Sequence, residues 1–234
     1  MSTKRISAVI LAAGSGSRMK SAVPKQYLNI LGESVIHRSV RAFYECDLID
    51  SLTVVTRVDE TESVRTLLSD LDSKPITVIE GGATRNESAF IGVSATDAEV
   101  VAIHDAARCL VTDEIITAVV NEALRVGAAS AGTFSTDTVK EAENKLIAKT
   151  LDRTKLYMAH TPQVFDRGEY LLALDELDYD GIITDDNMIF ELTGRRVAAV
   201  ETGKNNIKIT TAEDLLYAEF LLSHSKKETV NDIE

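Results

Sequence analysis

The chain has 234 residues, of which 44% are hydrophobic, and its formal net charge at pH 7 is −12. A chain of this length and composition can bury the core of one α/β domain spanning residues 1–234, with no linker-like tract to divide it. The acidic balance argues against non-specific nucleic-acid binding, which depends on a basic surface, although a few cations in one cleft could still hold an anionic substrate.

The chain also lacks the sequence features of a membrane or secreted protein. No apolar run approaches the ~20 residues that a membrane span needs, so we expect no membrane association. The two cysteines, Cys46 and Cys109, have a spacing that fits neither a zinc site nor a disulfide framework. A reducing cytoplasm is therefore the expected location.

The first predicted element is a buried strand at Ile6–Leu11, which opens into small residues and the glycines Gly14 and Gly16. Backbone N–H groups in such a loop can approach a polyphosphate closely, because no Cβ stands in the way. Arg18 and Lys25 then supply two cations. The loop lacks the third glycine of the dinucleotide fingerprint and the Gly-Lys-Ser/Thr triplet of the P-loop. It predicts a nucleoside triphosphate site, and the alternative is an ordinary strand-to-helix turn.

Strand-like and helix-like segments alternate along the rest of the chain. Apolar runs predict further strands at Leu52–Thr56, Ile76–Ile79, Val100–Ile103, Ala129–Phe134 and Val197–Glu201. Helical spacing and capping residues predict helices around 35–43, 64–71, from Thr84, 115–124, 166–177, from Thr184, and 211–222, the last with Leu215, Leu216, Ala218 and Leu222 inward. This alternation predicts an α/β fold with a mostly parallel sheet, helices on both faces, and binding sites at the carboxyl ends of the strands.

Residues 135–160 break the alternation. The segment is polar and includes a short alternating run around Leu146–Leu151, which favours an extended arm or hairpin over a core helix. Since a polar hairpin with little core of its own is marginally stable, we expect it to rest on another surface, most simply a second subunit.

Several motifs follow predicted strands. Gly81-Gly82 enters a helix whose Thr84 and Glu87 form a capping box, and its N–H groups suit an anion or a base edge, or merely a capped turn. Asp105 stands where a ribose hydroxyl or Mg²⁺ could be held. We interpret the neighbouring His104 as structural, and Arg108 as facing either a substrate phosphate or a surface acid.

Four later motifs are more ambiguous. Thr161-Pro162-Gln163 is interpreted as a rigid turn, and Asp137–Lys140 and Leu151–Arg153 flank the arm as possible solvated charge clusters. Lys208 is a single lysine in an apolar, β-branched strand end. Such a lysine usually extends its charge to solvent along apolar surface, but it could equally point its ammonium at a phosphate.

Read in chain order, nine segments carry a family resemblance: Leu11–Met19, Pro24–Leu28, Gly81-Gly82 with Arg85 and Ser88, His104–Arg108, Asp137–Lys140, Leu151–Arg153, Thr161–Gln163, Thr184–Asp186 and Asn206–Thr210. Together they resemble the 2-C-methyl-D-erythritol 4-phosphate cytidylyltransferases of the non-mevalonate isoprenoid pathway. The segments span almost the whole chain in the family's order, so chance agreement is negligible.

The resemblance implies a Rossmann-like nucleotidyltransferase domain whose protruding β-arm dimerises and helps complete the partner's site. The implied reaction joins CTP and methylerythritol 4-phosphate into 4-diphosphocytidyl-2-C-methyl-D-erythritol and releases pyrophosphate, with Mg²⁺ as the expected metal.

The resemblance also implies roles for individual residues. Arg18 and Lys25 match the pair that stabilises charge on the CTP phosphates, Lys208 matches a lysine near the α-phosphate, and Arg153 matches an arm arginine that positions the sugar phosphate. Substrate contacts are implied for Ala12, Ala13, Gly14, Gly82, Ala83, Ser88, Ala107, Arg108, Thr138 and Thr161, and for Asp105, which is also the candidate ligand of the metal.

The sequence departs from the family's pattern at two places. Cys109 stands where many relatives have proline, and Asn205 and Asn206 leave a second metal carboxylate unassigned. Two other functions remain as alternatives. One is cytidylyl transfer to another polyol phosphate, such as ribitol 5-phosphate, and the other is non-catalytic nucleotide binding.

Overall fold

The structure is a computed structural model that describes residues 4–14 and 24–228. The predicted cation Arg18 lies outside the described residues, and so does Gly16.

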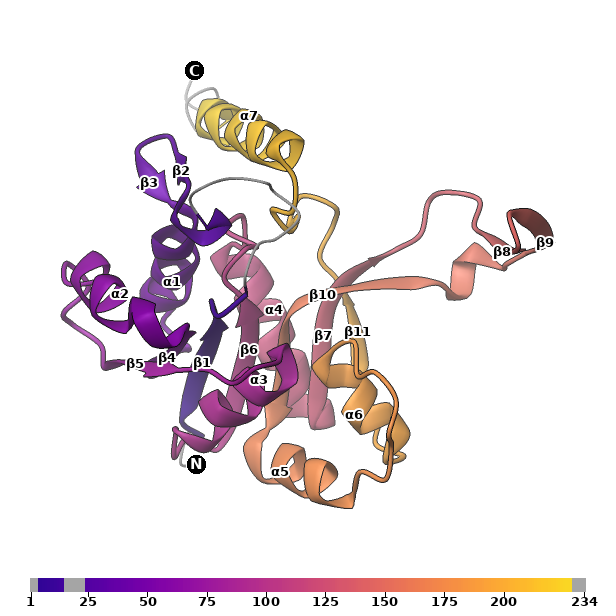
Figure 1. Cartoon of the computed structure of the whole chain (residues 1–234), viewed down its shortest axis with the longest axis horizontal. Coiled ribbons are helices and arrows are strands. Elements are labelled where there is room, and N and C mark those ends of the chain that lie inside the picture. The colour runs from indigo at the N-terminus through magenta and orange to yellow at the C-terminus, as the bar shows by residue number, and fades with distance from the viewer. Residues whose placement is uncertain (1–3, 15–23, 229–234) are drawn as a thin grey trace.

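A seven-stranded sheet forms the centre of the molecule (Figure 1). Its strand order is β11 (Ala198–Glu201), β7 (Ala128–Phe134), β10 (Tyr157–Asp166), β6 (Val100–Asp105), β1 (Ile6–Leu11), β4 (Ser51–Thr56) and β5 (Ile76–Glu80). Strand β10 runs antiparallel to both of its neighbours, and the other pairs are parallel. The predicted mostly parallel sheet is therefore confirmed.

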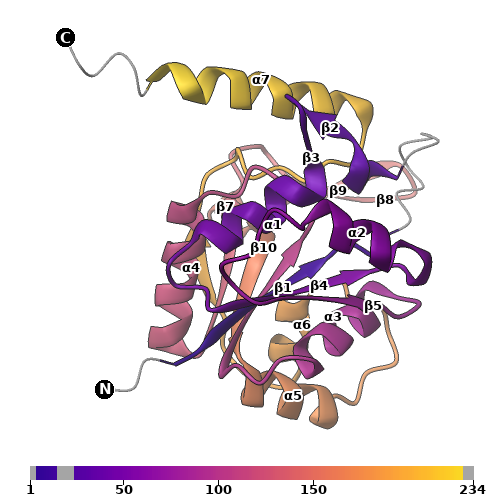
Figure 2. The same ribbon diagram turned by 90° about the vertical axis from the view of Figure 1, so that its left-hand side faces the viewer.

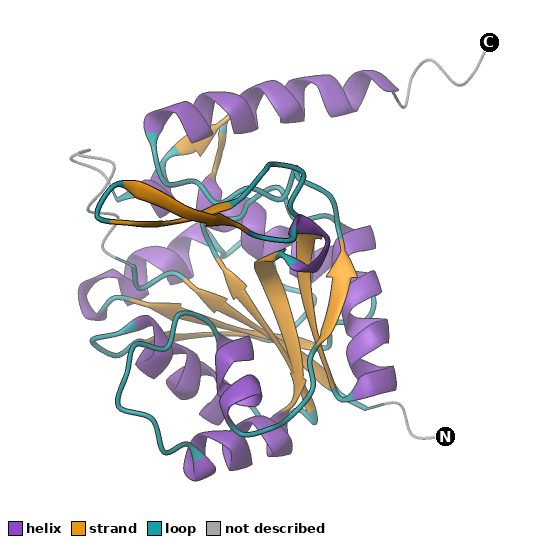
Figure 3. Ribbon diagram, turned by 90° about the vertical axis from the view of Figure 1, so that its right-hand side faces the viewer, coloured by secondary structure: helices purple, strands orange, loops and turns teal. Residues whose placement is uncertain are grey.

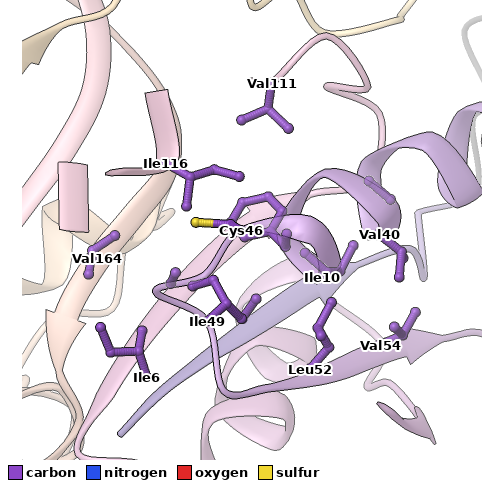
Figure 4. Close-up of a cluster of buried hydrophobic side chains, with 14 of the residues drawn as sticks. Ile6, Ile10, Val40, Cys46, Ile49, Leu52, Val54, Val111, Ile116 and Val164 are labelled. Carbon is purple, nitrogen blue, oxygen red and sulfur yellow. The ribbon is translucent and has the colours of Figure 1, made fainter. Parts of the chain in front are cut away.

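Helices cover both faces of this sheet (Figure 2). On one face, α1 (Val35–Glu45), α2 (Thr61–Leu67) and α4 (Asp113–Val126) bury their apolar sides in a cluster that also contains Ala8 and Ile10 of β1. Figure 4 shows part of this cluster. On the other face, α3 (Arg85–Ser94), α5 (Arg167–Glu176) and α6 (Asp186–Leu192) pack with Val9 of the same strand. A strand buried on both faces reads as a continuous apolar run, which is why β1 could be recognised from sequence.

A smaller cluster lies under α7 (Ala212–Glu228), which runs over the short hairpin of β2 (Asn29–Ile30) and β3 (Glu33–Ser34) (Figure 3). Ala218 is buried there, and Leu215 and Leu222 pack against the cluster as predicted. The prediction for Leu216 was wrong, since 67% of that residue is exposed. Helix α7 rests on the surface along a narrow contact, so a neighbouring apolar position on it can face outward.

The arm is a hairpin of β8 (Lys140–Glu143) and β9 (Leu146–Thr150), and Figure 1 shows it projecting from the body. Every residue of the two strands is exposed, including the apolar Leu146 and Ile147. A short 3-10 helix, η4 (Arg153–Lys155), leads back toward the sheet. Residues 157–160, which the sequence placed in the arm, begin β10, and Tyr157 pairs with Phe134 of β7.

Two local expectations were wrong. Thr161-Pro162-Gln163 is not a turn but lies inside β10, where the pairing with β7 shifts register between Ala159 and Gln163. Proline cannot donate a hydrogen bond to a neighbouring strand, so its presence argues against a strand in the sequence. Here the irregular stretch of β10 accommodates it. Helix α6 begins at Asp186 rather than Thr184, because Asp185 is the residue that caps it.

The topology creates a crevice beside β1. From β1 the chain continues to β4 and β5 on one side and then crosses to β6 on the other. The loops after β1 and β6 therefore diverge at their carboxyl ends, which is where ligands bind in open α/β sheets. Within the described residues, no helix has the length and apolar character needed to cross a membrane.

Candidate nucleotide-binding site

A pocket of about 390 Å³ opens at this crevice. The loop Leu11–Gly14 forms one wall, held by hydrogen bonds from Ala12 N to Val55 O (2.7 Å) and from Ala106 N to Leu11 O (3.0 Å). A Cβ added at Gly14 would meet no atom of the described residues within 4 Å, so this part of the chain leaves the backbone accessible to a ligand.

The opposite wall is the loop from β5 into α3. Gly82 N donates to Ser88 Oγ at 3.2 Å, and a Cβ on Gly81 would lie 2.7 Å from that same oxygen. A Cβ on Gly82 would lie 2.4 Å from the Cβ of Glu87. Only glycines allow the loop to fold this closely onto the start of α3. The predicted capping box of Thr84 and Glu87 is present, which confirms that expectation.

The same loop presents the N-terminal end of α3 to the pocket, where Thr84, Arg85 and Ser88 are lining residues. The first turn of a helix carries unpaired N–H groups and a partial positive charge. This wall therefore favours a negatively charged or hydrogen-bond-accepting ligand.

Among the described residues that line the pocket, Asp105 at the end of β6 is the single carboxylate. Its Oδ2 accepts from Lys208 Nζ at 2.6 Å, and its Oδ1 accepts from Arg85 Nε at 3.3 Å. Burial by itself would raise the pKa of the Asp105 carboxyl, but Arg85 and Lys208 together hold this pKa well below its usual range. Asp105 is therefore ionised at neutral pH.

Arg85 reaches a second carboxylate behind the pocket wall. Its Nη1 donates to Asp186 Oδ2 at 2.8 Å, and the hydroxyl of Tyr170 donates to Asp186 Oδ1, also at 2.8 Å. The side chain of Asp186 is fully buried. Burial would lower the pKa of Arg85, but the two carboxylates raise it above its ordinary value.

His104 lies beneath the pocket and is fully buried. Thr161 Oγ1 accepts from Asp105 N (3.0 Å) and lies 3.1 Å from His104 Nδ1, while His104 Nε2 lies 3.2 Å from Arg108 O. A carbonyl can only accept, so Nε2 carries the proton and Thr161 donates to Nδ1. Burial lowers the pKa of His104 to about 3, so the ring is neutral at pH 7.

Lys25 and Lys208 come to the pocket from opposite ends of the chain. Lys25, in the 3-10 helix η2 (Lys25–Tyr27), donates from Nζ to Ile209 O at 2.9 Å. Ile209 N in turn donates to Ala107 O at 2.8 Å. The segment after β11 is thereby fastened to both the β6 loop and η2, which brings the two ammonium groups to one site.

The structure gathers most of the site residues that the sequence predicted. Those that line the pocket are Ala12, Ala13, Gly14, Lys25, Gly82, Ala83, Ser88, Asp105, Ala107 and Lys208. Two more lie close behind it: Thr161, bound to Asp105, and Arg108, whose Nη1 donates to Asn206 O at 2.8 Å. Thr138 and Arg153 are exposed on the arm and do not line the pocket of their own chain.

Sequence reasoning gave no role to Arg85 or Asp186. Both stand in segments that matched the family pattern, Arg85 at the first position of a capped helix and Asp186 directly after a helix cap. A cation and an anion at element ends could each have been noted. Their pairing could not, since 101 residues separate them.

The side chains present at the pocket determine how a metal ion could be bound there. Within residues 4–14 and 24–228, no three His, Cys, Asp or Glu side chains are grouped as a metal site. Mg²⁺ is often bound through one or two carboxylates together with substrate phosphates. Asp105 fits such a site as the protein's contribution.

A glycine-walled, cationic pocket at the crevice of a Rossmann-like sheet defines a nucleotide-binding enzyme of the nucleotidyltransferase class. The family model for 2-C-methyl-D-erythritol 4-phosphate cytidylyltransferase (IspD) matches residues 6–224 of the chain. The chain belongs to this family and is a cytidylyltransferase, which confirms the resemblance seen in the sequence.

Individual relatives agree with this placement. The chain is 41% identical to the 2-C-methyl-D-erythritol 4-phosphate cytidylyltransferase of Caldanaerobacter subterraneus subsp. tengcongensis, over 93% of this chain and 98% of that protein. It is 37% identical to the protein of the same name from Shouchella clausii, over 92% and 95% of the two chains. The crystal structure of 4-diphosphocytidyl-2C-methyl-D-erythritol synthase from Anaerococcus prevotii matches with a TM-score of 0.84 and 31% identity, over 94% and 97%.

Proposed function

We propose that the pocket beside β1 catalyses the transfer of CMP from CTP to 2-C-methyl-D-erythritol 4-phosphate, with release of pyrophosphate. The observation that carries this proposal is the convergence of Lys25, Lys208 and Asp105 on one pocket walled by two glycine-containing loops. Membership of the cytidylyltransferase family supports the same reaction in isoprenoid biosynthesis.

The chemistry requires cations rather than a base. The attacking phosphate monoester has a second pKa near 6, so it is already mostly dianionic at pH 7. The barrier arises because one anion must approach another, and the enzyme has to neutralise charge and hold the reacting groups in line. The buried, neutral His104 fits this account, since no proton needs to be removed.

We assign the nucleotide to the inner pocket. Ala12, Ala13 and Gly14 on one side, and Gly82, Ala83, Ser88 and Ala107 on the other, would hold cytidine through backbone groups. Lys25, with Arg18, would stabilise charge on the triphosphate, and Lys208 would face the α-phosphate. Losing one such cation from a preorganised site typically costs on the order of 10²–10³ in rate.

Members of the family depend on a divalent metal ion, and we propose Mg²⁺ here. Asp105 would hold the ion together with the triphosphate, and the bound ion would neutralise phosphate charge. Each oxygen of Asp105 accepts one hydrogen bond, from Lys208 or from Arg85, and keeps a second lone pair that could face the ion.

The sugar phosphate would bind beside Arg108, whose buried Nε has no hydrogen-bond partner among the described residues. Arg153 and Thr138 would complete that subsite from the arm of a second subunit, because both are exposed on a hairpin that projects from its own body (Figure 1). We therefore propose a homodimer with shared sites. Two unpaired, buried cysteines accord with a cytoplasmic location.

A substrate panel tests the function. The purified protein is incubated with CTP, Mg²⁺ and either methylerythritol 4-phosphate or ribitol 5-phosphate, and pyrophosphate release is measured. We expect release with methylerythritol 4-phosphate and at most a trace with ribitol 5-phosphate. Preference for ribitol 5-phosphate would reassign the acceptor, and CTP binding without turnover on either would refute catalysis.

A further inference from the structure

Behind the pocket lies a row of four charges that alternate in sign. Asp186 contacts Arg85, Arg85 contacts Asp105, and Asp105 contacts Lys208, at 2.8, 3.3 and 2.6 Å respectively. The row begins in the buried interior and ends at the pocket. The proposed function uses Asp105 and Lys208 directly, but it leaves Asp186 without a role.

Asp186 is held more firmly than its position near a helix end requires. Its side chain is fully buried, and each carboxylate oxygen accepts a short hydrogen bond, from Tyr170 on α5 and from Arg85 on α3. Its backbone N–H donates to Gln163 Oε1 at 3.0 Å. Two elements therefore hold the carboxylate, and a third, β10, holds the backbone of the same residue.

The consequence for Arg85 follows from charge. A buried charge must be paired, so Asp186 holds the guanidinium in the wall through Nη1. Arg85 then reaches Asp105 only through Nε, at the longer distance of 3.3 Å. One oxygen of Asp105 remains for the 2.6 Å contact with Lys208.

We propose that Asp186 is a positioning residue for cytidylyl transfer, which acts through Arg85 to orient Asp105 toward Lys208. Without the Asp186 charge, the Arg85 guanidinium would form a bidentate pair with the Asp105 carboxylate, because this is the favoured geometry between the two groups. Asp105 would then be turned away from Lys208 and from the triphosphate. This inference rests on the proposed function, since it needs Asp105 and Lys208 to act on the nucleotide.

The test compares Asp186→Asn, Arg85→Gln and the double variant with the wild-type enzyme. We expect Asp186→Asn to lower kcat on the order of 10- to 100-fold, the range for one charge-assisted hydrogen bond, with a much smaller change in KM for CTP. If Asp186 acts through Arg85, the double variant will have the same kcat as Arg85→Gln alone. Losses that multiply in the double variant would overturn the inference.

Stability is measured alongside activity by urea unfolding. Glu33→Gln is the matched control, since Glu33 is also a largely buried carboxylate paired with arginines, Arg38 and Arg41, and it does not line the pocket. We expect this control to lose stability and keep its kcat. An Asp186→Asn variant that behaves like the control, while the wild type is active, would refute the positioning role. An inactive wild type would instead refute the proposed function.

Discussion

At the scale of single residues, His104 shows how burial can fix a protonation state. Its ring lies 4.8 Å from that of Phe43 between centroids, and both of its nitrogens are hydrogen bonded. Protonation would put an unpaired charge in the core, so burial lowers the pKa from about 6.5 to about 3. The residue supports the floor of the site while staying outside the chemistry.

This pKa shift predicts how stability depends on pH. Below pH 6.5 the unfolded chain binds a proton at His104 that the folded chain does not, so stability falls as pH falls from 6.5 toward 3. At about 1.4 kcal/mol per pH unit, the loss reaches roughly 2 kcal/mol by pH 5. We expect urea unfolding at pH 7 and pH 5 to show this loss in the wild type and a smaller one in His104→Gln.

His160 will supply part of the remaining slope, because burial lowers its pKa to about 4. His224→Gln, at an exposed position on α7, is the control for replacing a histidine as such. An unaltered pH profile in His104→Gln would show that the ring is not the source of the effect.

At the scale of elements, α3 connects local capping to the pocket. Thr84 Oγ1 accepts from Glu87 N at 3.1 Å, and Glu87 Oε2 accepts from Ala83 N at 2.7 Å. The cap of the helix therefore also holds the loop that lines one wall. A change at the cap should be felt by both the helix and the ligand.

We expect Thr84→Ala to lower stability by about 1 kcal/mol, the usual cost of a lost N-cap, and to raise KM for CTP. Thr112→Ala is the matched control: the Thr112 side chain also accepts from the backbone N–H three residues on, that of Ile115 in α4, but Thr112 does not line the pocket. Both variants should lose similar stability, measured by thermal unfolding, and only Thr84→Ala should change KM. Equal KM values in the two variants would argue against a role of the cap in the site.

At the scale of the whole molecule, the arm and the pocket lie apart in one chain. The exposed strands β8 and β9 bury little of their own apolar surface, including that of Leu146 and Ile147. A hairpin of this kind gains stability when a second surface covers it. A two-fold pair would let each arm reach the partner's site.

Mixing two inactive variants tests this arrangement. We expect Lys25→Ala and Arg153→Ala each to be nearly inactive as pure proteins, the second through poor use of the sugar phosphate. If Arg153 acts on the partner's site, a mixed dimer contains one intact site. Random exchange of subunits should then restore about a quarter of wild-type activity. If the arm serves its own chain, mixing will restore none.

Local patterns account for much of what the sequence predicted. Strand β1 has the predicted bounds, and Thr84 and Asp166 cap the helices that were predicted to begin there. These features depend on the periodicity of apolar residues and on hydrogen bonds between residues close in the sequence. Strand β10 was missed because Pro162 within it argues against a strand. Leu216 was wrongly predicted to be buried because the spacing of apolar residues along a helix does not show how much of its surface is covered.

The sequence by itself determined the class of fold and the glycine loops, since these follow from local composition and spacing. Its family resemblance also implied Lys25 and Lys208 as cations of the pocket, but not Arg85. Only the tertiary structure decided which charges meet. The contact between Arg85 and Asp186, and that between Lys208 and Asp105, join residues about a hundred positions apart. Such pairs are set by how the sheet is wound, and no local pattern in the chain encodes that proximity.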